Sequence, residues 1–191
     1  MWGKPGQQIM NQQQLLNELE KITEQHLIDA IGIFQNLNEQ QLSNPAANGG
    51  WSIAQCLWHL NSYGQYYLPL IKKSLQVAPD KPTSPMFKPG LLGDYFTRLM
   101  QPKADTKKMK APTNHTPLKI ENPYAVVADF IMQQENLLTY IRLARNKNLQ
   151  NSNIPTSIFR LIKLNTGDAL RFVIAHTERH MIQAKRNLTM L

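Results

Sequence analysis

Near the end of the chain, residues 166–188 read TGDALRFVIAHTERHMIQAKRNL. Apolar residues recur in this stretch at steps of three or four, which is typical of an amphipathic α-helix with one buried face. Thr166 is the expected N-cap, and Asp168 lies in the first turn. His176 and His180 are four residues apart, so their imidazoles share a face and suit two ligands of one metal ion. The alternative interpretation is a pair of polar residues at the edge of the core.

Three other segments show the same helical spacing. The first helix is expected over residues 11–37. The second begins after Ser52 as N-cap, and Pro69 should kink it or end it early because proline lacks an amide donor. The third opens with Asn122 as cap and Pro123 in its first turn. Four long amphipathic helices without convincing strand alternation predict an all-α fold, a four-helix bundle.

The connections between these helices differ in length. Residues 76–121 hold seven prolines and break every pattern except a short helix near residues 93–100. A crossover this long lets the second and third helices run parallel, because a short loop would make them antiparallel. Residues 148–165 form a second connection, with a short helix expected from Pro155 to Lys163. The length of 191 residues fits a single domain over residues 1–191.

Composition limits the classes of partner. The chain has 21 Lys and Arg against 13 Asp and Glu, a formal net charge of +8. No aromatic residues lie among the lysines of the densest basic stretch, so a solvated loop is favoured over a nucleic-acid surface, with an anionic substrate or partner as the alternative. That stretch contains Lys103, Asp105, Lys107, Lys108 and Lys110. No apolar run approaches the roughly 20 residues of a membrane span, and no secretory signal is visible. We therefore expect a cytoplasmic protein without a nucleic-acid or membrane partner.

Two histidines that point into a core need partners, because an unsatisfied buried polar group costs about 1–3 kcal/mol. His59 is the best candidate for a third ligand, since it lies between Cys56 and Tyr63 beside the buried stripe of the second helix. His26 follows a polar helix edge and His115 lies in the crossover, so both rank lower. A ligand from a second helix would complete a site with the pair on the last helix.

Other side chains near these histidines allow two interpretations. Gln55 and Gln183 each lie within one turn of a candidate histidine, and each is either a group that orients a ligand or touches a cofactor or substrate, or a solvated glutamine. Cys56 is interpreted as a small buried core residue, although its spacing would let it reach a metal. Glu178 faces away from the histidine pair. No carboxylate is identified for acid–base work beside these histidines, which favours thiol transfer or Lewis-acid chemistry over protease-like hydrolysis.

Two separated motifs resemble the DinB/YfiT-like superfamily. The first is Trp51 to Gln55 followed by His59 and Leu60, and the second is Thr166 to Val173 followed by His176, Arg179, His180 and Gln183. The resemblance implies a bundle in up-down-down-up order and a divalent metal held by His59, His176 and His180. Three nitrogen ligands leave open coordination positions, and such a set suits zinc, nickel, iron or manganese.

The same resemblance implies a function. Characterised relatives include thiol-dependent transferases and isomerases that use bacillithiol, mycothiol or glutathione, and others are labelled metal-dependent hydrolases. We therefore expect a metal-dependent enzyme acting on a small molecule, either a thiol-dependent S-transferase, with a low-molecular-weight thiol as cofactor, or a hydrolase. The alternative is a non-catalytic metal-binding stress-response or interaction protein. Because relatives are often dimers, a homodimer is also expected.

Overall fold

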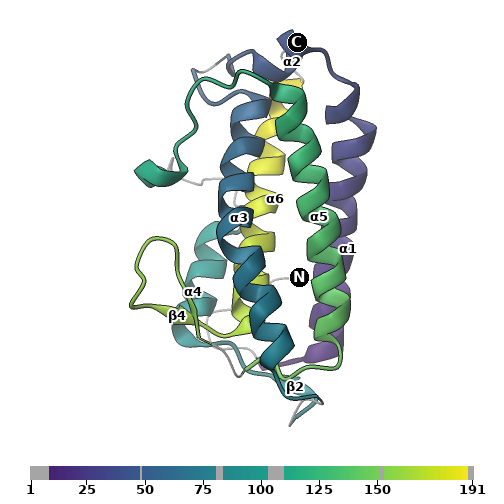
Figure 1. The fold of residues 1–191 in the computed structure, drawn as a ribbon, viewed down its shortest axis with the longest axis vertical. Coiled ribbons are helices and arrows are strands. Elements are labelled where there is room, and N and C mark those ends of the chain that lie inside the picture. Colours follow the sequence, from purple (N-terminus) through teal and green to yellow (C-terminus); the bar gives the residue numbers. More distant parts are fainter. Residues whose placement is uncertain (1–8, 48, 81–83, 103–109, 151–152, 189–191) are drawn as a thin grey trace.

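Four long helices pack side by side in the computed structural model of the chain (Figure 1). They are α1 (Gln12–Gly32), α3 (Ile53–Val77), α5 (Pro123–Ala144) and α6 (Thr166–Leu188). The structure describes all residues except 1–8, 48, 81–83, 103–109, 151–152 and 189–191. The predicted all-α four-helix bundle is confirmed. No helix among the described residues has the length and hydropathy to cross a membrane.

Shorter elements complete the described part of the chain. They are β1 (Met10–Asn11), the 3₁₀ turns η1 (Phe34–Asn36) and η2 (Thr113–His115), α2 (Glu39–Ser43), β2 (Met86–Phe87), α4 (Leu91–Met100), β3 (Ile154–Pro155) and β4 (Lys163–Leu164). The expected short helix in the crossover is α4, which begins two residues earlier than predicted. Most of the predicted basic stretch lies outside the described residues.

The ends of the helices show which way each one runs. Gln12 begins α1 and its Nε2 donates to the carbonyl of Lys147, just beyond the end of α5, at 3.0 Å. Ser74 near the end of α3 lies 2.7 Å, Oγ to Oγ1, from Thr166 at the start of α6. The helices of both pairs are therefore antiparallel.

The remaining pairs run parallel. Asn61 of α3 donates to the carbonyl of Val126, and both residues lie in the first halves of their helices. Lys185 near the end of α6 contacts Asp29 near the end of α1 at 2.6 Å. Consequently α1 and α6 run one way while α3 and α5 run the other way (Figure 1).

Local sequence accounts for the helix starts at α3 and α5. Ser52 and Gln55 form a reciprocal capping box at the start of α3. Asn122 accepts from the amide of Ala125, and Pro123 occupies the first position of α5. Pro69 does not end α3, which continues to Val77. Both Pro69 and Gln65 are exposed, so water can replace the hydrogen bond that the proline removes.

Three local predictions are wrong. The first helix ends at Gly32 rather than near residue 37, and Asn36 Nδ2 donates to the carbonyl of Gly32 beyond its end. The stretch predicted as a helix from Pro155 to Lys163 instead connects β3 and β4, which pair in antiparallel register. At the start of α6 the side chain of Asn165, not Thr166, accepts from the amide of Asp168 at 2.7 Å. The Thr166 hydroxyl is used in the contact with α3.

The crossover is fastened to α6 by a buried group of charges, the α4–α6 ion cluster of Asp94, Asp168 and Arg171. Arg171 donates to Asp94 Oδ1 at 2.9 Å and to Asp168 Oδ1 at 3.1 Å. The second oxygen of Asp168 accepts the amide of Gly90 at 2.7 Å. All three charged residues are at least nine-tenths buried. The pairing is needed because an uncompensated buried charge would be strongly destabilising.

Replacing Gly93 with Ala tests this packing. A Cβ at Gly93 would lie 2.3 Å from Asp168 Cγ and 2.5 Å from its Cβ, and Asp168 is held by the ion cluster. We expect Gly93→Ala to lower the free energy of unfolding by about 1–3 kcal/mol in urea denaturation. Gly32→Ala is the matched control, because nothing lies within 4 Å of a Cβ there. Equal stability of the two variants would contradict the packing argument.

Candidate metal centre

Three histidines from two helices meet inside the bundle. His59 comes from α3, and His176 and His180 come from successive turns of α6. One ligand atom from each lies within 4.8 Å of the other two, and the Nε2 atoms of His59 and His176 are 3.1 Å apart. Four-coordinate zinc with nitrogen ligands places those nitrogens about 3.4 Å apart. The structure therefore brings together the three histidines that the sequence singled out.

The second nitrogen of two rings fixes the direction of the first. His59 Nδ1 lies 2.6 Å from the carbonyl oxygen of His115, which can only accept, so the hydrogen is on Nδ1. His180 Nδ1 lies 2.9 Å from Gln183 Oε1 and is a donor for the same reason. In a neutral imidazole the other nitrogen, Nε2, then carries a lone pair. Nε2 is therefore the nitrogen that each ring can offer to a metal, and without metal that of His59 can accept a hydrogen bond from His176 Nε2 at 3.1 Å.

Burial keeps the three rings neutral. It lowers the pKa of His59 to about 4, an effect partly opposed by the hydrogen bond to the His115 carbonyl. Burial and the neighbouring His59 lower the pKa of His180 to about 3. The pKa of His176 falls well below its usual value, first through burial and then through the nearby histidines and Arg179. A divalent ion requires neutral imidazoles, so this donor set fits one at neutral pH.

Aromatic rings enclose the histidines. The Trp51 ring stacks over His180 at a centroid distance of 5.8 Å and lies 4.8 Å from His59. Tyr63 lies 4.4 Å from His176 and 5.0 Å from His59. Burial raises the pKa of Tyr63 to about 12, so its phenol stays protonated. These rings pack over His59 and His176, whereas His180 and Trp51 are only partly buried.

The glutamines and the cysteine have separate roles. Gln183 contacts a candidate ligand directly, whereas Gln55 takes part in the α3 capping box and donates to the Leu118 carbonyl at 3.4 Å. Cys56 is fully buried among apolar residues, and burial raises its pKa to about 12. Its interpretation as a core residue agrees with this position.

The crossover lies closer to the histidine group than its sequence suggests. His115 is buried, and its ring lies 6.5 Å from that of His59. No local periodicity signals this proximity, because the η2 turn comes from a proline-rich segment. His26, expected on a polar edge, is also buried, and its Nε2 lies 2.6 Å from Glu178 Oε2. Glu178 is thereby directed at α1, as its predicted orientation away from the histidine pair requires.

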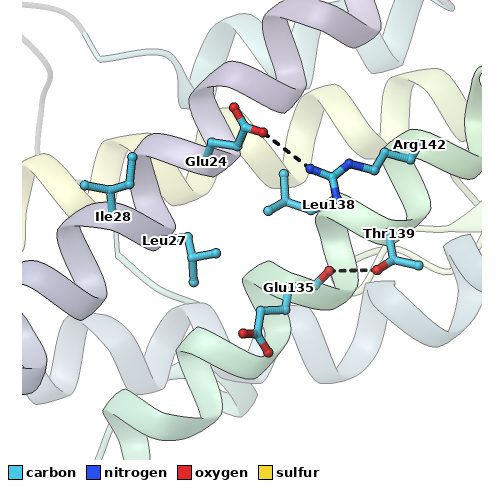
Figure 2. A pocket seen from close by; sticks show the side chains of 7 residues that line it. All are labelled: Glu24, Leu27, Ile28, Glu135, Leu138, Thr139 and Arg142. Carbon is cyan, nitrogen blue, oxygen red and sulfur yellow. Dashed lines mark hydrogen bonds and ion pairs between the residues drawn. The ribbon is translucent and has the colours of Figure 1, made fainter.

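A surface hollow of about 500 Å³ lies elsewhere, between α1 and α5 (Figure 2). Its walls combine apolar side chains with an ion pair in which Arg142 lies 3.4 Å from Glu24. The lining residues are Glu24, Leu27, Ile28, Glu135, Leu138, Thr139 and Arg142. None of them belongs to the histidine group, so this hollow is separate from the candidate metal centre.

Comparisons with known proteins agree with this architecture. Residues 22–184 match the family described as the DinB superfamily. The fold is similar to that of YfiT from Bacillus subtilis, described as a probable metal-dependent hydrolase with an unusual four-helix bundle topology. The TM-score is 0.56 at 15% sequence identity, and the match covers 98% of this chain and 93% of YfiT. No curated protein sequence matches this chain.

Replacing His180 with Ala should remove most bound metal, because two imidazoles would remain where three converge. Elemental analysis after saturation with zinc and desalting is the measurement. Helicity should be largely retained, since Leu, Ile, Val and Phe dominate the core. His115→Ala is the control and should keep one equivalent of zinc at saturation, because no nitrogen of His115 belongs to the converging group. Full zinc in His180→Ala would refute the assignment.

The metal-free protein should become less stable as the pH falls from about 6.5 towards 4. The folded pKa values of the three histidines lie below the usual 6.5, so the unfolded chain binds more protons in this range. Urea denaturation at pH 7.0, 6.0 and 5.0 measures the slope. His180→Leu removes one such group and should reduce the slope by up to about 1.4 kcal/mol per pH unit. A slope unchanged by His180→Leu would contradict the prediction.

Proposed function

Because the chain belongs to the DinB superfamily, we propose that it is a divalent-metal-dependent enzyme whose centre is His59, His176 and His180. The convergence of three neutral imidazole nitrogens carries this proposal. Three protein ligands leave at least one coordination position for water or substrate, which is the arrangement of catalytic rather than structural sites.

The bound ion would supply Lewis acidity and stabilise a thiolate or hydroxide at neutral pH. This chain's own residues hold and shield that position. The His115 carbonyl and the Gln183 side chain keep two imidazoles in the ligand tautomer. Trp51 packs against His180 and Tyr63 packs against His176. Low local dielectric strengthens every electrostatic contact made there.

For the reaction, we propose thiol-dependent S-transfer to a small electrophile. Among the described residues, no carboxylate joins the histidine group, and Glu178 is paired with His26. Three neutral ligands would leave the charge of a divalent ion uncompensated, and Arg179 adds positive potential at His176 and His180. In this positive potential a thiol would give up its proton to solvent, so no carboxylate is needed as a general base. The thiolate would then form a carbon–sulfur bond with the electrophile while a leaving group departs or an epoxide ring opens.

Hydrolysis is the second candidate, because YfiT, which has a similar fold, is described as a probable metal-dependent hydrolase. At 15% identity this likeness concerns the fold, so the reaction has to be distinguished by assay. A non-catalytic metal-binding protein is the third outcome. In each case we propose a small-molecule ligand and cytoplasmic location, with no nucleic-acid or membrane partner.

A direct assay separates these functions. Protein purified without an affinity tag is loaded with zinc, nickel, iron(II) or manganese and mixed with a halonitrobenzene or an epoxide. Glutathione, bacillithiol, mycothiol and cysteine are offered in turn. We expect loss of the electrophile at least about tenfold above background with one metal and one thiol, and background rates for His180→Ala. Metal-dependent cleavage of a p-nitrophenyl ester without thiol would indicate a hydrolase. Full metal occupancy with neither reaction would favour the non-catalytic alternative.

A further inference from the structure

A closed ring of hydrogen bonds joins His59 of α3 to the η2 turn of the crossover. His59 Nδ1 donates to the His115 carbonyl at 2.6 Å. Ser62 Oγ donates to the His59 carbonyl at 2.7 Å, because a carbonyl can only accept. The Ser62 hydroxyl hydrogen is then used, so the 2.9 Å contact between Ser62 Oγ and His115 Nδ1 has His115 as the donor. Every donor and acceptor in the ring is therefore assigned.

The His115 side chain is held by this contact and by packing. Its ring stacks on Tyr63 at a centroid distance of 3.9 Å, and it is 4% exposed. Its Nδ1 is bound to Ser62, while its Nε2 is buried and makes no hydrogen bond. Within the turn, Thr116 Oγ1 donates to the Pro112 carbonyl at 3.0 Å. The backbone bond from His115 to the Pro112 carbonyl at 2.9 Å shapes the turn, while the Ser62 contact and the Tyr63 stack join it to α3.

We propose that Ser62 and His115 are positioning residues of the metal centre, which fix the tautomer and ring direction of His59 through the His115 carbonyl. This inference rests on the proposed function, since it concerns a ligand of the same centre. His115 acts through its backbone and is outside the group of nitrogens that converge. The η2 turn thereby becomes part of the metal site, and its docking on α3 is coupled to metal affinity.

The competing explanation is that Ser62 only bonds to its own helix, as serines in helices often do. Ser74 offers a matched control, because it is a serine of the same helix and its hydroxyl bonds to Thr166. It lies at the other end of α3 from His59. If loss of a helix serine were the whole effect, Ser62→Ala and Ser74→Ala would change the zinc affinity equally.

The test measures zinc affinity at pH 7.0 by competition with a chromophoric chelator. Ser62→Ala should bind zinc about tenfold more weakly, in the range typical of groups that orient a ligand. Ser62→Thr keeps the hydroxyl and should stay within about threefold of the wild type. His115→Phe keeps an aromatic ring but loses the Nδ1 donor, so it should lower the zinc affinity as much as Ser62→Ala does. Ser74→Ala should bind zinc like the wild type. All variants should reach one equivalent at saturation.

A second readout needs no metal. Long-range ¹⁵N–¹H spectra of the metal-free protein should show His59 as the Nδ1–H tautomer, and a mixture of tautomers in Ser62→Ala. Wild-type zinc affinity in Ser62→Ala, or an equal loss in Ser74→Ala, would overturn the inference and leave the proposed function standing. Zinc retained in full by His180→Ala, or no zinc bound by the wild type, would overturn both.

Discussion

The approach of His59 Nε2 to within 3.1 Å of His176 Nε2 places two imidazoles from different helices around one point in the interior. The histidine rings at this point stay neutral, because burial and mutual repulsion both oppose their protonation. In each neutral ring, the nitrogen that carries the hydrogen also needs a hydrogen-bond acceptor. The His115 carbonyl and the Gln183 amide meet this requirement for His59 and His180. Burial of the polar rings costs free energy, and metal binding to the folded protein would offset that cost.

The rest of the bundle is arranged around this polar layer. Two apolar clusters lie along the helices, one including Tyr63, Phe172 and Val173, the other including Leu60 and Met181. On α6 the histidine pair falls in sequence between the last member of the first cluster, Ile174, and the first α6 member of the second, Met181. On α3, His59 lies among members of the second cluster, immediately before Leu60, after which the first cluster begins at Tyr63. The apolar clusters supply the folding stability, so the histidine layer can be specialised for chemistry.

Local physics made much of this structure predictable from sequence. The period of 3.6 residues identifies the four helices, and Ser52 and Asn122 act as caps through contacts with their own helices. The pair on α6 follows from spacing alone, while the addition of His59 needed its place beside a buried stripe and the family motif. The contribution of His115 was hidden because a backbone carbonyl has no sequence signature. The predicted helix from Pro155 to Lys163 was wrong because the β3–β4 pairing depends on contacts between segments that are separated in sequence, which local spacing does not reveal.

The α4–α6 ion cluster has a consequence for how the chain can vary. Asp168 and His176 are eight residues apart on one continuous helix, a rise of about 12 Å. One inserted or deleted residue between them would rotate everything beyond it by about 100°. Either the charged cluster or the imidazole pair would then face the wrong side of the bundle. Apart from Arg171 of the ion cluster, residues 169–175 can exchange side chains of similar volume, yet their number is fixed. The length of this segment therefore sets the relative orientation of the ion cluster and the imidazole pair.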